Sequence, residues 1–206
     1  MNLISAEIIQ DINPLKAGIK VNFDAEICFI VGDNGVGKST LLECIADHFG
    51  YKDDTYMKRS KMKDNILIEK SDTKFPFKYI DFHGDDKKFS GAFGNDMGLQ
   101  IMQMKASSGQ VSISLINKVL GDIPNMKGSL VVLDEPCRGQ SIKNKLRMTT
   151  VIRNLAFKLD CQVIVTTHSD WILSAFDGVA QYFDIVANKN TTYKEYITSQ
   201  LTDLFP

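Results

Sequence analysis

The chain has 206 residues, of which 44% are hydrophobic and 24% are charged, and its formal net charge is −1. These values suit one globular domain over residues 1–206, and they exclude an overall attraction for nucleic acid or for an anionic membrane surface. No run of about 18 apolar residues and no signal peptide is present, and the four cysteines form no Cys-x-x-Cys pair, so we expect a cytoplasmic protein without membrane insertion whose cysteines are reduced and buried.

Short apolar segments between turn signals predict the elements of the first half of the chain. Apolar stretches at residues 3–9 and 19–23 flank a turn region that contains Pro14 and Gly18, and both stretches are expected to be strands. Further elements are predicted as strands at residues 26–31, 66–69 and 77–82 and as a helix between Thr40 and Phe49.

The second half alternates apolar strands with amphipathic helices. The predicted elements are helices at 111–120, 142–159, 170–176 and 193–204 and strands at 130–133, 163–165 and 182–186. Within the helix at 142–159, we expect Leu146, Ile152 and Leu155 on the buried face. This alternation predicts an α/β fold with a mostly parallel central sheet flanked by helices, to which the opening segment adds antiparallel strands.

Residues 32–39 read Gly-Asp-Asn-Gly-Val-Gly-Lys-Ser, which matches the phosphate-binding pattern Gly-x-x-x-x-Gly-Lys-Ser/Thr. The glycines let the backbone point successive N–H groups at phosphates, Lys38 adds a positive charge, and Ser39 offers its hydroxyl to Mg²⁺. A strand before the loop and an amphipathic helix after it supply the context that a chance glycine-rich turn lacks. We therefore expect the chain to bind ATP and to hydrolyse it. The predicted nucleotide-binding residues of the loop are Gly32, Asn34, Gly35, Val36, Gly37, Lys38, Ser39 and Thr40.

Two carboxylates follow the buried strand at residues 130–133. Asp134 ends this strand and is expected, together with Ser39, to hold Mg²⁺ beside the phosphate loop. Glu135 is expected to accept a proton from the water that attacks the γ-phosphate. An Asp-Glu pair at a strand end is also typical of a solvated turn, but the phosphate loop in the same chain favours the catalytic interpretation.

Thr166-Thr167-His168-Ser169 follows the next buried strand. A histidine here can hydrogen-bond both the γ-phosphate and the attacking water, so we expect His168 to distinguish ATP from ADP. A lone histidine is more often a structural or surface residue, but a place one strand after the carboxylates favours the sensor role. The predicted catalytic residues are Lys38, Glu135 and His168.

Four motifs in this order resemble the ABC-type ATPase family. They are the phosphate loop at 32–40, Ser-Ser-Gly-Gln at 107–110, Leu-Asp-Glu-Pro at 133–136 and Thr-His-Ser at 167–169. In that family, a signature motif like the Ser-Ser-Gly-Gln at 107–110 starts a helix and completes the nucleotide site of a second subunit. The resemblance implies the P-loop NTPase fold of ABC type and a head-to-tail homodimer that buries MgATP. The cross-dimer binding residues that it implies are Ser107, Ser108, Gly109 and Gln110.

The chain departs from the family pattern in three places. His83-Gly84 stand where the family's glutamine loop is expected, and His83 is either a replacement ligand for Mg²⁺ or water or a surface loop residue. Gln140-Ser141 stand where the family often has an aspartate, which leaves the usual cross-dimer contact open. The helix at 111–120 begins Val-Ser-Ile-Ser and lacks the Gln-Arg run of transporter subunits. These departures favour a small non-transporter ATPase that resembles SMC-like, repair, phage or defence ATPases.

The resulting hypothesis is an ATP-driven dimerisation switch that serves a DNA-related or partner-protein process. The basic stretch at 58–63 is compatible with a nucleic-acid backbone, although aspartates around it also fit a solvated loop. Lys143, Lys145 and Arg147 are interpreted as the exposed face of their helix, and residues 51–110 as a variable helical or irregular lobe that includes the signature loop. Two alternatives stay open: a nucleotide-binding subunit of an ABC transporter, and a slow-turnover regulatory or defence switch.

Overall fold

A computed structural model describes residues 3–51, 62–71, 74–82, 125–137 and 139–204. Within these residues, the central sheet has six strands in the spatial order β5 (Phe77–Asp81), β6 (Leu130–Asp134), β7 (Gln162–Thr166), β3 (Ile27–Val31), β8 (Gln181–Asp184) and β9 (Lys189–Thr191). The first five run parallel, and β9 pairs antiparallel with β8. The prediction of a mostly parallel sheet is therefore confirmed.

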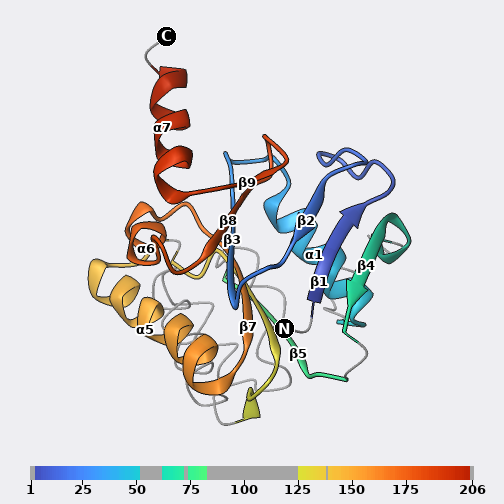
Figure 1. Cartoon of the computed structure of the whole chain (residues 1–206), viewed down its shortest axis with the longest axis horizontal. Coiled ribbons are helices and arrows are strands. Elements are labelled where there is room, and N and C mark those ends of the chain that lie inside the picture. Colours follow the sequence, from blue (N-terminus) through green and yellow to red (C-terminus); the bar gives the residue numbers. More distant parts are fainter. Residues whose placement is uncertain (1–2, 52–61, 72–73, 83–124, 138, 205–206) are drawn as a thin grey trace, which may run out of the picture.

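The central strands are buried on both faces. Every residue of β3, β6 and β7 is buried, and valine, isoleucine and leucine predominate in them. One apolar cluster joins the sheet to α5 (Ile142–Leu159) and α6 (Asp170–Ala175), while a second cluster joins the alternate strand residues to α1 (Lys38–His48). Because successive residues of a strand point to opposite faces, the two clusters lie on opposite sides of the sheet. Figure 1 shows α5 and α1 on these two sides.

A second sheet is antiparallel, with the order β2 (Lys20–Asn22), β1 (Leu3–Ile8) and β4 (Ile66–Lys70). This confirms that the opening segment adds antiparallel strands. A short 3₁₀ helix, η2 (Met62–Asn65), precedes β4 and contacts α1. Apolar residues of both sheets and of α1 share one cluster, so the second sheet helps to fix α1 and the loop that precedes it.

α5 has the predicted bounds but not the predicted buried face. Leu146 is 50% exposed, whereas Met148 and Ile152 are fully buried. At about 100° per residue, Leu146 lies on the opposite side of the helix from these two residues. The prediction for Leu146 is therefore wrong, while Ile152 and Leu155 are buried as expected.

The remaining elements agree with the sequence except at a few points. α1 begins at Lys38 rather than at Thr40, since the helix starts directly after the phosphate loop. β9 is polar and carries no apolar alternation, so the sequence does not predict it. α7 (Tyr193–Leu204) has the predicted bounds. The predicted helix at 111–120 and most of the lobe at 51–110 lie outside the described residues, so both stay predictions.

Gln162 joins the two sheets through its side-chain amide. Its Oε1 accepts a hydrogen bond from the Leu3 N–H at 2.7 Å, its Nε2 donates to the Leu3 carbonyl at 2.8 Å, and both residues are buried. We expect Gln162→Leu to lower the free energy of unfolding by about 2 kcal/mol or more, because two backbone groups lose their partners out of reach of water. Urea denaturation followed by circular dichroism measures this change.

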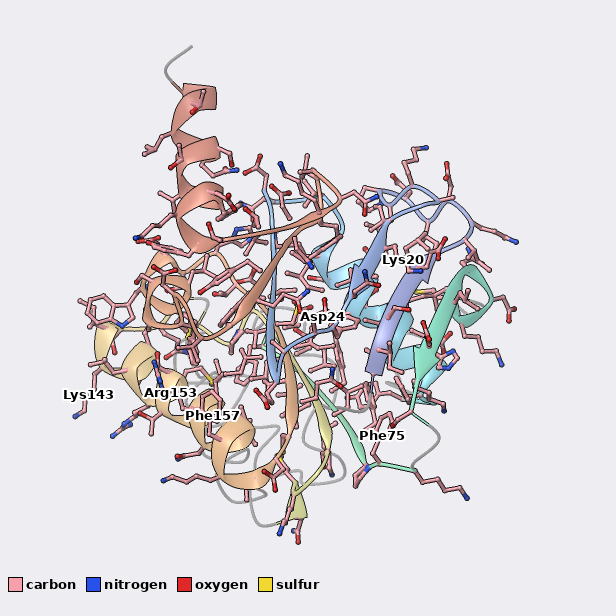
Figure 2. The ribbon with its side chains drawn as sticks, in the orientation of Figure 1. Lys20, Asp24, Phe75, Lys143, Arg153 and Phe157 are labelled. Atoms are coloured by element: carbon pink, nitrogen blue, oxygen red, sulfur yellow. The ribbon has the colours of Figure 1, made fainter. Side chains whose placement is uncertain are left out.

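Gln181→Leu is the matched control for this prediction. Its amide also bonds two backbone groups, the Asp24 N–H and the Asn22 carbonyl, but these hydrogen bonds are exposed. Figure 2 marks Asp24 on the segment that leads into β3. Water can replace these partners, so the expected loss is below about 1 kcal/mol. Equal losses for the two variants would contradict the explanation by burial.

Candidate active site

The loops after β3, β6 and β7 meet at one edge of the central sheet, because neighbouring parallel strands end on the same side. They border a pocket of about 690 Å³. Its lining residues are Asn13, Pro14, Asn34, Gly35, Gly37, Lys38, Ser39, Thr40, Glu135, Cys137, Gly139, Lys145, Thr167, His168 and Ser169. The phosphate loop and the two later motifs therefore share one pocket.

The phosphate loop folds through glycines in left-handed backbone conformations. The φ angle is 144° at Gly32, 78° at Gly35 and 103° at Gly37. At Gly37, an added Cβ would lie 2.4 Å from Leu15 Cδ2, so a side chain there would displace the packing beside the loop. Helix α1 starts at the next residue without a side-chain cap or an acid in its first turn, which suits its N–H groups to an anion. Gly32 and Val36 are predicted binding residues that do not line the pocket.

Lys38 is held by its own loop. Its Nζ donates to the carbonyl oxygens of Gly32 at 2.9 Å and Asp33 at 2.8 Å, and lies 2.9 Å from His168 Nε2. Burial lowers the pKa of this ammonium, and nearby carboxylates oppose that shift. Lys38 is only 6% exposed, so the pocket has a buried cation in place before any ligand binds.

Asp134 ends β6 and is 1% exposed. Its carboxylate accepts hydrogen bonds from Ser39 Oγ at 3.1 Å, from Tyr79 OH at 3.3 Å and from the Thr166 hydroxyl. Mg²⁺ prefers oxygen ligands, and at phosphate sites it needs few protein groups because water and phosphate oxygens complete its shell. The juxtaposed hydroxyl and carboxylate of Ser39 and Asp134 therefore fit this ion.

Glu135 adopts a left-handed backbone conformation, with φ of 50°. This conformation is uncommon outside glycine and tends to occur at functional sites. Its N–H donates to both the carbonyl and the hydroxyl of Thr166, at 3.1 Å each. The side chain lies beside His168: Oε1 is 3.3 Å from the Nε2 atom, and Oε2 accepts a hydrogen bond from the backbone N–H at 3.4 Å. Glu135 is 7% exposed, so this carboxylate is shielded from bulk water.

His168 lies between the Lys38 ammonium and the Glu135 carboxylate. Its Nε2 lies within 2.9 Å of Lys38 Nζ and within 3.3 Å of Glu135 Oε1. Its side chain is 40% exposed, so the imidazole faces the open part of the pocket. The structure thus brings the three residues predicted to be catalytic into one chain of contacts, although they come from separate loops.

Several predicted positions lie elsewhere. Residues 107–110, His83 and residues 58–61 of the basic stretch lie outside the described residues. Lys63, also from that stretch, is exposed, and its backbone N–H donates to Asp47 at 2.9 Å. The roles proposed for these positions stay predictions.

The pocket also contains residues that sequence reasoning missed. Asn13 and Pro14 come from the connection between β1 and β2, and Lys145 comes from the first turn of α5. The prediction that Lys145 belongs to the exposed face of the helix is wrong, since this residue is half-buried and lines the pocket. Lys143 and Arg147 are exposed as expected. The only sequence signal for Lys145 is its place in the first turn of the helix that follows Asp-Glu-Pro.

Comparisons with known proteins agree with this architecture. A family model described as AAA domain matches residues 8–198. The zinc import ATP-binding protein ZnuC of Buchnera aphidicola subsp. Acyrthosiphon pisum is 25% identical over 161 residues, which cover 73% of this chain and 66% of that protein. A bacterial Atm1-family ABC exporter with ATP bound has a TM-score of 0.56 at 14% identity, over 97% of this chain and 41% of that one. A dimeric ATP-binding cassette in a post-hydrolysis state, bound to ADP and Pi, has a TM-score of 0.50 at 12% identity, over 93% and 98% of the two chains.

The chain spans 66% of the length of the first relative and 57% of the next one, a zinc import ATP-binding protein of Vibrio vulnificus. In the parts of the chain that the structure describes, no helix combines the length and the apolar character that crossing a bilayer requires.

Proposed function

This chain belongs to the AAA domain family and is a P-loop ATPase of the ABC type, and we propose that it hydrolyses MgATP at the interface of an ATP-induced head-to-tail dimer. The contact chain of Lys38, His168 and Glu135 carries this proposal. In this chain of contacts, an ammonium, an imidazole and a buried carboxylate surround one pocket beside the phosphate loop, which supports the roles of phosphate binder, sensor and base. Charge stabilisation and positioning are what phosphoryl transfer requires of a protein.

Lys38 and the phosphate loop bind and orient the substrate. In the structure, the Lys38 ammonium donates to two loop carbonyls and contacts His168, all of which are weaker partners than a phosphate oxygen. On binding, the ammonium turns toward the β- and γ-phosphates, and the N–H groups at the start of α1 hold the same charge. His168 Nε2 then loses Lys38 as a neighbour and is free to contact the γ-phosphate.

Glu135 supplies the base for the chemical step. A water oxygen attacks the γ-phosphorus, its proton passes to the Glu135 carboxylate, and the bond between that phosphorus and the bridging oxygen of ADP breaks. ADP leaves with the bonding electrons, and the proton of Glu135 returns to solvent or to the released phosphate. The position of Glu135 supports this role, since its buried carboxylate lies beside His168 and lines the pocket that the attacking water would share.

Ser39 and Asp134 would hold Mg²⁺, which supplies charge neutralisation on the phosphates when it is bound. The hydroxyls of Tyr79 and Thr166 orient the Asp134 carboxylate from behind. Such supporting hydrogen bonds fix the direction of a metal ligand. This arrangement explains why a carboxylate that is 1% exposed ends a buried strand.

In the proposed dimer, a second copy of the chain completes the ATP site. The pocket is open to solvent, and the signature residues 107–110 would close it from a second copy. The dimeric cassette with the same fold is consistent with this arrangement. Such closure excludes water and strengthens every charge interaction inside. What the dimer drives is a second question, and the zinc-import relatives favour a transporter partner over the DNA-related process that the sequence departures suggest.

Steady-state phosphate release by the wild-type chain with MgATP tests the activity, and size-exclusion chromatography with light scattering tests the assembly. We expect release at about 1 s⁻¹, the slow end of the ordinary range of enzymes, for a cassette without its partner. A mass increase to a dimer is expected with ATP but not with ADP. Stimulation of turnover by DNA or by a membrane partner selects between the two processes. A chain that neither binds ATP nor changes mass would contradict the proposal.

A further inference from the structure

Lys145 brings a second cation to the pocket, from an element that no nucleotide motif includes. It lies in the first turn of α5, is half-buried and lines the same pocket as Lys38, Glu135 and His168. Its neighbour Lys143 is exposed and is not among the lining residues. Figure 2 shows Lys143 pointing away from the molecule at the end of α5. Two lysines of one turn therefore have different surroundings, and of the two only Lys145 lines the pocket.

The charge of Lys145 has no anionic partner among the residues that the structure describes. Its position also opposes the helix dipole, since a cation in the first turn of a helix is unfavourable and α5 has no acid there to offset it. Lys145 is thus a half-buried lysine that belongs to no ion pair in the described residues and stands at the positive end of a helix. A bound anion would stabilise both the ammonium and the helix end.

The backbone under Lys145 is fixed. Asn144, which is 8% exposed, donates its Nδ2 to Gln140 Oε1 at 2.9 Å, and Gln140 is 9% exposed. The N–H groups of Asn144 and Lys145 both donate to the Ser141 carbonyl at 3.0 Å. The buried pair of Asn144 and Gln140 holds the start of α5, and with it the backbone of Lys145, against the loop after Glu135.

Lys145 and Glu135 line the same pocket. Burial raises the pKa of the Cys137 thiol to about 12, while the positive charge of Lys145 opposes this shift and the negative charge of Glu135 adds to it. Cys137 and Gly139, which lie between Glu135 and α5 in sequence, line the same pocket. A base that activates the attacking water must lie beside the terminal phosphate of ATP. Lys145 lines the same pocket as this base, which brings its charge toward the terminal phosphate.

From this geometry we infer that Lys145 is a positioning and charge-stabilising residue that contacts the terminal phosphate of ATP bound to the same chain. The inference rests on the proposed function, because it assigns a partner within the proposed ATP site. It makes Lys145 a determinant of the preference for ATP over ADP. Lys38, by contrast, lies in the phosphate loop, where it serves both nucleotides.

The test compares ATP and ADP affinity in Lys145→Met and Lys145→Ala, with Lys143→Ala as the matched control. Binding of both nucleotides is measured by isothermal titration calorimetry with Mg²⁺, at a chain concentration where light scattering shows a monomer. We expect both Lys145 variants to bind ATP about 10-fold or more weakly, since a charged hydrogen bond is lost, and to bind ADP as the wild type does. Lys143→Ala is expected to leave both affinities unchanged, and Lys145→Arg to recover part of the ATP affinity.

Three results would contradict the role inferred for Lys145. Equal losses for ATP and ADP would overturn the assignment to the terminal phosphate, and unchanged ATP affinity in Lys145→Met would overturn the contact itself. The same loss in Lys143→Ala would also overturn it, because the effect would then be one of net charge. Lys145→Met keeps the apolar stem, so a wild-type melting temperature in this variant separates the contact from folding. A wild-type chain that binds no ATP would refute the proposed function rather than this residue's place within it.

Discussion

Glu135→Gln is expected to lower ATP turnover by about 10²–10⁴-fold while ATP affinity changes little. The substitution keeps the size of the side chain and one acceptor oxygen, so the contacts with His168 at 3.3 and 3.4 Å can persist in part. An amide cannot take the proton of the attacking water, however. Binding and chemistry should therefore separate in this variant.

The same variant should accumulate the ATP-bound dimer. If hydrolysis reopens the proposed dimer, a chain that binds ATP without cleaving it stays closed, and light scattering should report twice the monomer mass with MgATP. Removal of ATP by gel filtration into nucleotide-free buffer should restore the monomer. Single-turnover phosphate release, measured at saturating enzyme, checks that the chemical step is the one that slows.

Glu69→Gln provides the control for this variant. Glu69 lies on β4 and accepts a hydrogen bond from Ser5 at 3.2 Å, away from the pocket lining. Its turnover and mass should equal those of the wild type. A Glu135→Gln chain that hydrolyses ATP normally would remove Glu135 from the role of base, and one that binds ATP but stays monomeric would contradict the dimer.

The sequence predicts the framework of the site because the framework depends on local signals. A glycine pattern, apolar strands with carboxylates at their ends and a helical period each lie within a few residues, so the C-terminal edge of a parallel sheet follows from them. The strand at 130–134, the loop at 32–39 and the helix at 142–159 illustrate this. The mostly parallel fold that they imply is confirmed.

The contacts that complete the site are not local, and the sequence does not predict them. Tyr79 reaches Asp134 only because β5 pairs with β6 in a register that places Tyr79 beside Val132. Leu15 leaves no room for a side chain at position 37, because the connection before β2 packs on the phosphate loop. From the sequence, Lys145 is predicted to belong to an exposed, charged helix face, because the helical period alone does not tell which polar residues face a pocket.

Asp134→Asn is expected to abolish the Mg²⁺ dependence of the ATPase and to lower turnover by at least about 100-fold, since a metal ion supplies several kcal/mol of transition-state stabilisation. The side chain keeps its shape but loses the charge beside Ser39. ATP affinity in the presence of EDTA should stay within a few-fold of the wild type, because the phosphate loop and Lys38 are intact. The gain in affinity that Mg²⁺ gives the wild type should vanish.

This variant also carries a stability effect that must be separated from the loss of the ion. Three hydroxyls, those of Ser39, Tyr79 and Thr166, donate to the Asp134 carboxylate in the interior. An asparagine has one acceptor oxygen and an NH₂ group that donates, so at least one hydroxyl loses its acceptor, at about 1–3 kcal/mol of unfolding free energy. Urea denaturation in EDTA measures this loss of unfolding free energy in the absence of Mg²⁺.

Asp184→Asn is the control that distinguishes a lost metal ligand from a changed strand end. Asp184 ends β8 at the same edge of the sheet, and a single carboxylate oxygen, Oδ1, accepts the N–H groups of Val186 at 2.9 Å and Ala187 at 3.0 Å. An asparagine keeps that acceptor, so stability and Mg²⁺ response should both be those of the wild type. If Asp134→Asn instead retained the wild-type Mg²⁺ response, Asp134 would not hold the ion. Its burial would then serve only to tie Ser39 to the sheet.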